Sequence, residues 1–351
     1  MHKRKGIPGY LLIAIFFLTA CTSAVPIKSL SAGNTTTSPV QVDRIDVCHQ
    51  ITSSSNLPLL YAQEKGLFKK YGLEVTLTSV DTGTKAATAM IAGEFPICQV
   101  GGVSITNAVV AGEDLVYIAD YFNSYVMSLM VTPDIKTPAD LKGKIVVTSE
   151  PGSVVDAAMR AALLSFNLIP EVDVAFINVS GASNRMAALE AGRASGSLFA
   201  PPLTLTLREK GYTTLLDLTT LDQAFPYYGI ATSRTYLKTH RATVTNFMKA
   251  IIESIAGILS DPEGSKSVLA EHLEMDEVKD AALLEEAYQA HYYQIIRKKP
   301  FPTIEGIQTV LNQIGEENPN AKNTQPEDVI DMSIIKELDD SGFIDALYAA
   351  Q

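Results

Sequence analysis

Short polar loops follow several apolar, strand-like segments of this sequence, and they hold the residue types that could bind a small ligand. They are largely uncharged and rich in hydroxyls and glycine: Ser54, Ser55 and Asn56; Thr84; Gly102 and Ser104; and Gly152 and Ser153. Hydroxyl and amide groups hydrogen-bond polar ligands, and N–H groups at a helix start attract an anion or a partly negative ring atom. Each position also suits a simple helix cap or turn.

Aromatic residues and prolines offer a second kind of contact. Tyr121 and Tyr228 supply a flat apolar face and a hydroxyl, which suit a ring-shaped ligand. Pro201, the first of two consecutive prolines after an apolar segment, would form a rigid wall. Packing at a junction and strand termination are the alternatives. Cations are few near these loops, with Lys85 and Arg185 the main candidates for holding an anion.

The histidines and cysteines show none of the spacings that metal sites or nucleophilic catalysis require. The five histidines form no zinc motif or nucleophile elbow, and the cysteines form no CxxC. We therefore expect no metal, no cofactor and no enzymatic activity. His49 is either a ligand contact or a core residue. Cys48 and Cys98 lie in apolar, strand-like segments. Such positions suit either two buried thiols or one disulfide.

The N-terminus has the layout of an export signal. Basic residues at positions 3–5 precede an uncharged apolar run over 9–20, which is short for a membrane span. The run ends in Leu18-Thr19-Ala20-Cys21, which resembles the lipobox of bacterial lipoproteins. This resemblance implies a signal peptide over 1–20, acylation of Cys21 and an extracytoplasmic, membrane-anchored protein. An ordinary signal peptide is the alternative. Residues 21–40 are rich in Ser and Thr and read as a flexible tether.

Charge and length narrow the function classes. The sequence has 28 Lys+Arg against 39 Asp+Glu, and loss of the three basic signal residues would leave a net charge of about −14. Such a charge disfavours nucleic acid as a partner, because phosphate contact needs clustered Lys and Arg. The residues after the tether exceed the size at which one core usually stops growing, so we expect two lobes.

Strand and helix patterns alternate after the tether and predict an α/β fold. Strands are expected over 43–51, 73–80 and 95–102, with helices over 58–71 and 84–92 between them. A second series has strands over 144–148, 172–178 and 194–199 and helices over 154–166 and 183–191. Two βαβαβ series imply two doubly wound lobes with flanking helices. Further helices are expected over 241–260, 265–273, 281–292 and 304–314.

Several segments in order resemble one family of binding proteins. Residues 61–75, YAQEKGLFKKYGLEV, are similar to the opening of the nitrate, sulfonate, taurine and thiamine-precursor group of ABC-transporter substrate-binding proteins. Later landmarks of that family are matched by residues 87–94 with the Gly101-Gly102 turn, and by 138–144, 186–192 and 338–345. The resemblance implies a two-lobe periplasmic binding protein, with lobe one over 41–131 and 228–351 and lobe two over 132–227.

The resemblance also implies partners and leaves the ligand open. A protein of this kind would be a monomer that captures a small molecule between its lobes and delivers it to an ABC permease and its ATPase. We favour a heteroaromatic nutrient such as riboflavin or a thiamine pyrimidine, because the loops are neutral and tyrosines are near. An alkanesulfonate, taurine or nitrate is the alternative. A thiamine-pyrimidine synthase-like enzyme or a receptor-coupled sensor would be another class of protein.

Overall fold

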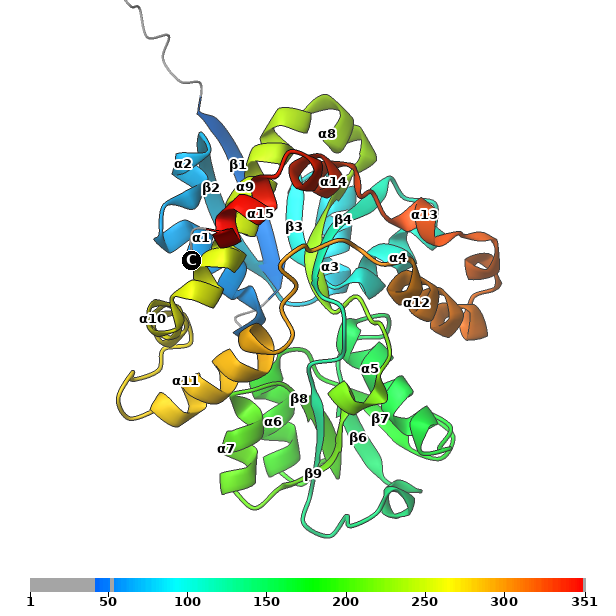
Figure 1. The fold of residues 1–351 in the computed structure, drawn as a ribbon. Helices are drawn as coiled ribbons and strands as arrows, with labels where there is room; N and C mark the ends of the chain where they lie inside the picture. Colours follow the sequence, from blue (N-terminus) through cyan, green and yellow to red (C-terminus); the bar gives the residue numbers. More distant parts are fainter. Residues whose placement is uncertain (1–41, 51–53, 350–351) are drawn as a thin grey trace, which may run out of the picture. The chain divides into compact units, whose positions relative to one another are not determined.

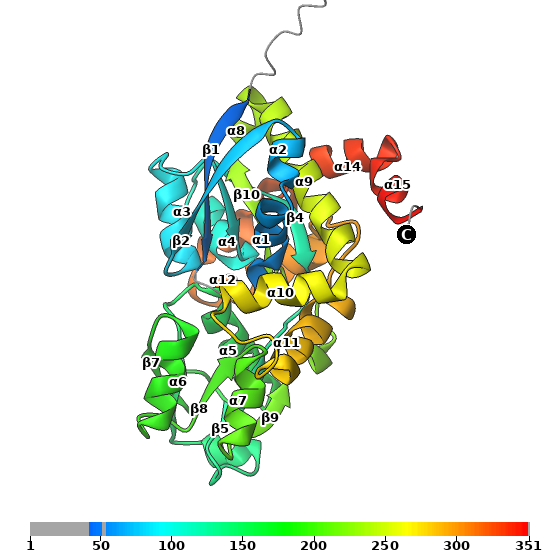
Figure 2. The same ribbon diagram turned by 90° about the vertical axis from the view of Figure 1, so that its left-hand side faces the viewer.

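A computed structural model describes residues 42–50 and 54–349, except for the side chain of residue 317. The described residues form one compact unit with two sheets. Figures 1 and 2 show these sheets, with β1, β2, β3 and β4 in one and β6, β7, β8 and β9 in the other. Cys21, the predicted signal peptide and the predicted tether lie outside the described residues.

The first sheet forms lobe one and has the order β2-β1-β3-β10-β4. Its strands are β1 (Asp43–Gln50), β2 (Leu73–Val80), β3 (Ile97–Val100), β4 (Leu115–Phe122) and β10 (Tyr228–Ser233). β1 runs parallel to both β2 and β3, whereas β10 is antiparallel to β3 and β4. β4 is buried along its whole length, including Asp120, as expected of a mostly apolar strand that is covered on both faces.

The second sheet forms lobe two and has the order β7-β6-β8-β5-β9. Its strands are β5 (Ser128–Val131), β6 (Ile145–Thr148), β7 (Ala175–Asn178), β8 (Gly196–Phe199) and β9 (Thr213–Asp217). β6 is parallel to β7 and β8, and β5 is antiparallel to β8 and β9. The predicted α/β class and two-lobe architecture are confirmed. Each sheet is mixed, because one strand, β10 in the first sheet and β5 in the second, is antiparallel to its neighbours.

Helices flank both sheets. Lobe one carries α1 (Leu57–Glu64), α2 (Leu67–Lys70), α3 (Gly83–Ile91) and α4 (Gly102–Val110), and lobe two carries α5 (Val154–Ser165), α6 (Ala182–Glu190) and α7 (Leu203–Glu209). The helix expected over 58–71 is two helices, because Gly66 has a φ of +68° at the break. The remaining helices are α8 (Arg234–Thr239), α9 (Arg241–Ser260), α10 (Pro262–His272), α11 (Ala281–Tyr288), α12 (Ile304–Glu317), α13 (Pro326–Val329), α14 (Ser333–Asp340) and α15 (Phe343–Ala349).

Helix α9 contributes many buried residues to the core of lobe one. It packs on α1 and α2, and Phe247 on α9 stacks against Phe68 on α2 with ring centroids 5.3 Å apart. Among the described helices, α9 alone is long and apolar enough to cross a membrane. Its apolar residues, including Val244, Ile251 and Ile255, are buried in the protein core. The burial of each such side chain stabilises the fold by about 1.5–3 kcal/mol.

The chain crosses between the lobes at residues 122–128 and 217–228. We predicted the first crossing near 131, with residues 128–131 in lobe one, and the strand pairing corrects this. β5 pairs with β8 and β9 of lobe two, so the crossing comes before Ser128. β5 lies between β8 and β9 as an antiparallel strand. An apolar segment of this kind could be buried in either sheet, so its sequence does not show which lobe it joins.

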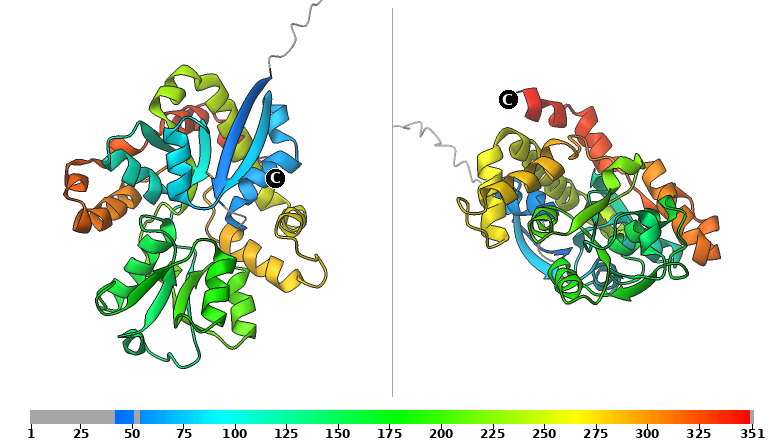
Figure 3. Two further views of the ribbon diagram at one scale, coloured as in Figure 1. Left: turned by 180° about the vertical axis from the view of Figure 1, so that it is seen from behind. Right: turned by 90° about the horizontal axis from the view of Figure 1, so that it is seen from below.

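Part of the C-terminal region also reaches lobe two. Helix α11 contacts both α10 and α7, and these three helices lie close together in Figures 2 and 3. Glu286 on α11 accepts hydrogen bonds from Thr204 at 2.9 Å and Arg208 at 2.7 Å, both on α7. Helix α11 is therefore an exception to the prediction that all of residues 228–351 belong to lobe one.

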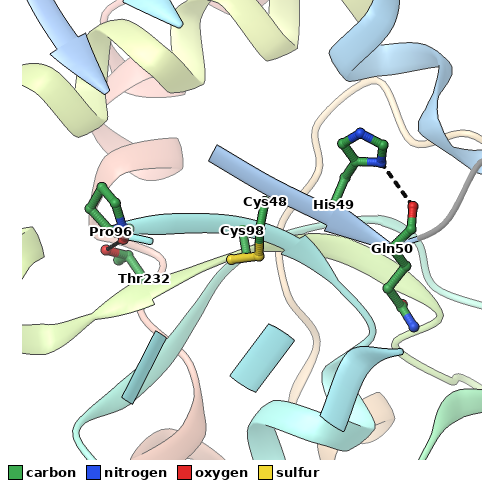
Figure 4. The surroundings of a disulfide bond; sticks show 6 residues. All are labelled: Cys48, His49, Gln50, Pro96, Cys98 and Thr232. Atoms are coloured by element: carbon green, nitrogen blue, oxygen red, sulfur yellow. Dashed lines mark hydrogen bonds between the residues drawn. A yellow bond between two sulfur atoms is a disulfide. The ribbon is translucent and has the colours of Figure 1, made fainter. Parts of the chain in front are cut away.

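A disulfide joins β1 and β3 in the middle of lobe one. Cys48 and Cys98 face each other in the parallel register with their Cα atoms 4.5 Å apart, and Figure 4 shows the bond beside His49 and Gln50. Both residues are fully buried. Of the two states that the sequence left open, the structure has the disulfide. This bond fixes the two strands whose ends lead toward the cavity between the lobes.

Candidate functional site

A cavity of about 540 Å³ lies between the two lobes. Its size falls within the roughly 300–1,000 Å³ of small-molecule sites. Residues from both sheets and from the C-terminal region line it. These residues are Gln50, Ser54, Asp81, Thr82, Met127, Ser149, Ser153, Val154, Val155, Gly181, Ala182, Ser183, Asn184, Arg185, Ala200, Pro201, Pro202, Leu203, Thr206, Tyr227, Tyr228, Leu273, Met275, Asp280 and Leu283.

The ends of parallel strands place most of these residues. Gln50 ends β1, Thr82 follows β2, Ser149 follows β6 and Pro201 follows β8. Strand ends and helix starts meet at this edge of a parallel sheet, which is where ligands of open α/β sheets bind. The side-chain oxygen Oε1 of Gln50 is buried and has no hydrogen-bond partner among the described residues. A ligand with a donor group could satisfy this atom.

The helix starts of lobe two differ in what they offer to a ligand. At the start of α5, side chains of the protein already accept hydrogen bonds from the backbone N–H groups. Gly152 N–H donates to the Asp156 carboxylate at 3.2 Å, and Asp156 N–H donates to Ser153 Oγ at 3.2 Å. Burial raises the pKa of Asp156, against the lowering effect of Arg160. At α6, the N-cap Gly181 provides no side-chain cap, so the N–H groups of the first turn remain open to a ligand.

Arg185 lies at the first turn of α6, and its side chain is almost completely buried at the cavity wall. Its exposed fraction is 5%, and its Nη2 donates to Leu198 O over a long 3.4 Å. Among the described residues its Nε has no hydrogen-bond partner and no carboxylate forms a salt bridge with it. Burial lowers the pKa of Arg185 to about 10, against the raising effect of Tyr227 and Tyr228, so the guanidinium is charged at neutral pH.

Two tyrosines from the second crossing stand beside this cation. Tyr227 and Tyr228 line the cavity with their ring centroids 4.8 Å apart in an edge-to-face arrangement. Burial raises the pKa of both hydroxyls, so both stay protonated at physiological pH and can donate hydrogen bonds. An aromatic face, two donors and one buried cation are therefore gathered at one wall of the cavity.

Polar contacts join the lobes at the edges of the cavity. Ser54 Oγ donates to Pro201 O at 2.9 Å, and Thr82 Oγ1 donates to Glu150 at 2.7 Å. Glu150 also accepts from Ser180 at 3.1 Å within lobe two. Residues 54 and 82 belong to lobe one and residues 150 and 201 to lobe two, so these hydrogen bonds hold the two lobes together.

Four of the eleven predicted ligand-binding residues line the cavity: Ser54, Ser153, Pro201 and Tyr228. The Ser153 hydroxyl is already used as the cap of α5, and the peptide bond between Pro201 and Pro202 is cis. Ligand contact by these four residues stays a prediction. The other seven lie outside the lining, for different reasons.

In the first loop, Ser55 and Asn56 turn into the core. Both are fully buried. The amide of Asn56 donates to Gln50 O and accepts from Gln99 Nε2, each at 3.0 Å, and Gln99 also donates to Ser55 O at 3.1 Å. These bonds hold the turn after β1, so the pair serves the fold where we expected a ligand contact. The neighbouring His49 is also buried outside the lining, with Nδ1 2.8 Å from Gln50 O.

The remaining predicted residues in lobe one are displaced by local packing. Thr84 is exposed in the first turn of α3 and lies outside the lining. Gly102 donates its N–H to Pro226 O at 2.8 Å, and a Cβ at this glycine would lie 2.6 Å from Pro226. Ser104 is buried beside Gly83, and Tyr121 is fully buried in β4. In lobe two, Gly152 takes a φ of +75° at the turn before α5 and lies outside the lining.

Sequence reasoning missed the wall that the C-terminal region forms. Leu273, Met275, Asp280 and Leu283 line the cavity, although no strand precedes them. They follow α10 and lead into α11, which packs on lobe two. No local signal identifies these positions, because they reach the cavity only through helix packing. Of the two cations that the sequence indicated as candidates for holding an anion, Arg185 lies in the cavity wall, whereas Lys85 lies outside the lining and pairs with Asp81.

Comparisons with solved structures agree with the two-lobe fold described above. No curated protein matches the chain. The alkanesulfonate-binding protein SsuA from Xanthomonas axonopodis pv. citri, bound to MOPS, is 19% identical with a TM-score of 0.71, and the match covers 83% of this chain and 99% of that one. The periplasmic aliphatic sulphonate binding protein SsuA from Escherichia coli is also 19% identical, with a TM-score of 0.66 and coverages of 82% and 98%.

The periplasmic nitrate-binding protein NrtA from Synechocystis PCC 6803 is 14% identical with a TM-score of 0.65, and the match covers 86% of this chain and 89% of that one. At such identities these likenesses show the fold, which is that of periplasmic binding proteins. A family model described as "NMT1/THI5 like" matches residues 53–265, more than half of the sequence. In agreement with the sequence landmarks, the chain belongs to the NMT1/THI5-like family.

Proposed function

We propose that this protein is the solute-binding component of an ABC importer, which captures a small organic molecule between its lobes. The observation that carries the proposal is the cavity of about 540 Å³, lined by strand ends of both sheets. The fold shared with SsuA and NrtA supports the same function. Among the described residues, the lobes are joined by two chain crossings, by the contacts of α11 with α7 and of α4 with α5, and by the hydrogen bonds of Ser54 and Thr82. A hinge motion at the crossings would break these contacts to admit a ligand, and closure would bury it.

The side chains around the cavity favour binding over catalysis. Among the described residues, one serine–histidine pairing resembles a catalytic dyad: His291 Nδ1 is 3.4 Å from the Ser54 hydroxyl. That hydroxyl donates its proton to Pro201 O at 2.9 Å, so His291 is not placed to accept it. Burial also lowers the pKa of His291 to about 4. We therefore propose a binding protein and not a synthase-like enzyme.

The cellular arrangement follows from the sequence. An export signal and acylation at Cys21 would anchor the protein on the extracytoplasmic side of the membrane, where a permease could receive the ligand. The partners would be that permease, its ATPase and the membrane through the lipid, with the protein acting as a monomer. A sensor that contacts a membrane receptor would bind ligand equally well, and isolation of a complex with the permease distinguishes these two roles.

The ligand preference changes in the light of the cavity. Tyr227 and Tyr228 support a flat ligand, as the preference for riboflavin or a thiamine pyrimidine assumed. That preference also rested on loops with few cations, whereas Arg185 lies in the cavity wall. A neutral vitamin would leave this cation without a counterion. The alternative of an anionic ligand, such as an alkanesulfonate, gains support.

The test combines ligand binding with a change of shape. Thermal shift with nitrate, taurine, alkanesulfonates, thiamine pyrimidines and riboflavin identifies binders, since a ligand at 100 times its dissociation constant stabilises by about 2.7 kcal/mol. Small-angle scattering with a binder should then show a smaller radius of gyration. A Thr206→Trp variant, which fills the cavity, should lose binding, whereas Thr84→Trp on the outer surface should keep it. Equal binding by both variants would place the site elsewhere.

A further inference from the structure

Arg185 is a buried charged group for which the described part of the chain supplies no anionic partner. The guanidinium is 95% buried at the cavity wall and lies over the Phe199 ring, 5.8 Å from its centroid. It makes one long hydrogen bond to Leu198 O and has no carboxylate partner among the described residues. By contrast, Arg160 and Arg208, also in lobe two, pair with Asp156 and Glu286. Burial of an unpaired charge is costly, and a protein keeps one where something else neutralises it.

The start of α6 points to the same spot. Ala182, Ser183 and Asn184 line the cavity in the first turn, next to Arg185, and the N-cap Gly181 has no side chain to occupy the free N–H groups. At α5, the Asp156 carboxylate already occupies the equivalent position. A negative group bound at α6 would thus meet both the guanidinium and the positive end of the helix dipole.

Another part of the lining is apolar. Leu203, Leu273, Met275 and Leu283 contribute hydrocarbon and thioether surface, and Tyr228 adds an aromatic face. The leucine and methionine side chains offer no hydrogen bonds to an ion such as nitrate, and the cavity is much larger than such an ion needs. The body of the ligand must therefore be organic and largely apolar to fill this space.

Two carboxylates limit the charge of the ligand. Asp81 and Asp280 line the same cavity; Asp81 forms an ion pair with Lys85, and Asp280 accepts the N–H of Asp276 at 3.0 Å. Asp280 has no cation partner among the described residues. A second negative charge on the ligand would be repelled by these groups.

We propose that the cavity binds an organic monoanion, a carboxylate or sulfonate, whose charged group contacts Arg185 and the first turn of α6 and whose apolar body lies against residues 203, 273, 275 and 283. This inference rests on the proposed function and narrows its ligand class. Arg185 is the residue that selects for charge, and the leucines and Met275 select for an apolar body.

The first experiment needs no ligand. Arg185→Met keeps the length of the side chain and removes the unpaired charge, so the melting temperature of the empty protein should rise by about 2 °C. Arg193→Met is the matched control, because Arg193 is an exposed cation of the same lobe; its melting temperature should stay unchanged. A fall for Arg185→Met beyond that of the control would mean that the guanidinium stabilises the fold, and it would overturn the inference.

The second experiment uses matched probes. Naphthalene-2-sulfonate should bind in calorimetry, whereas its neutral analogue naphthalene-2-sulfonamide and the small anion methanesulfonate should bind at least about tenfold more weakly, as expected for loss of a charge-assisted hydrogen bond or of the apolar body. Arg185→Met should weaken sulfonate binding at least about tenfold, Arg185→Lys should retain part of it, and Arg193→Met should leave it unchanged.

The outcomes separate this inference from the proposed function. If the sulfonamide or riboflavin binds as well as the sulfonate, or if Arg185→Met binds the sulfonate as wild type does, the anion inference is wrong while solute binding stands. If naphthalene-2-carboxylate and the sulfonate both fail on a protein that binds a neutral compound, the inference is equally overturned. If no compound of the full panel binds, the proposed function fails and the inference fails with it.

Discussion

Replacement of Asn56 with alanine tests whether this residue serves the fold or the ligand. The sequence predicts a ligand contact, and on that basis the variant should lose affinity. In the structure the amide is fully buried and joins Gln50 O to Gln99 Nε2 through two hydrogen bonds of 3.0 Å. We therefore expect the main loss in the free energy of unfolding.

The hydrogen-bond geometry sets the size of this loss. Asn56 Nδ2 also lies 3.2 Å from His49 Nδ1, but that nitrogen is 2.8 Å from the carbonyl oxygen of Gln50, which can only accept. His49 Nδ1 must therefore carry the proton, and its contact with the Asn56 amide is not a hydrogen bond. Gln99 keeps its bond to Ser55 O in the variant. Two lost bonds correspond to about 1–3 kcal/mol.

Urea denaturation followed by circular dichroism measures this loss, with Thr84→Ala as the control. Thr84 was predicted to bind ligand on the same grounds, yet it is exposed, so its replacement should change stability by less than about 0.5 kcal/mol. Calorimetry with a confirmed ligand completes the assay. An Asn56→Ala variant that is as stable as wild type but binds ligand much more weakly would refute the structural role and restore the sequence-based one.

Three further predictions concern the anchor, the disulfide and pH. Cys21→Ala should release the protein from the membrane fraction of a bacterial host, and wild-type protein without an acyl mass on Cys21 would contradict the lipid anchor. Reduction of the disulfide, or a Cys48→Ala/Cys98→Ala variant, should lower stability by about 4 kcal/mol, because the bond closes a 50-residue loop in the unfolded chain; thermal unfolding with and without dithiothreitol measures this loss. Burial lowers the pKa of His291 to about 4, below its unfolded value near 6.5, so its contribution to stability falls as pH drops from 6.5 toward 4. The loss should reach about 2 kcal/mol at pH 5, and a pH–stability curve for His291→Gln that keeps the same slope as wild type would disprove it.

Local sequence signals predicted much of the architecture. The period of apolar residues located most strands and helices of both lobes to within a few residues, as for β2 (Leu73–Val80) and α9 (Arg241–Ser260). Such signals work because burial of one face of a strand or helix imposes a fixed spacing on the sequence. The family could be predicted as well, since its landmarks are short segments read in order along the chain.

The strand-end rule predicted which loops would approach the cavity but not which side chains would reach it. The loop after β1 contributes Ser54 to the lining, whereas its neighbour Asn56 turns inward to satisfy buried polar groups. Adjacent residues of one loop point in different directions, and that choice depends on which buried donors and acceptors lie behind the loop. The sequence of the loop does not show which donors and acceptors these are.

The sequence by itself determined the α/β class, the two alternating series of strands and helices and the absence of metal-ligand spacing among its histidines and cysteines, because these follow from neighbouring residues. Only the tertiary structure decided that β5 joins the second sheet, that Cys48 and Cys98 meet across parallel strands, and that residues 273–283 form a wall of the cavity. It also decided that Arg185 is buried without a carboxylate partner among the described residues. These features depend on contacts between residues far apart in the chain, whose energies no short segment encodes.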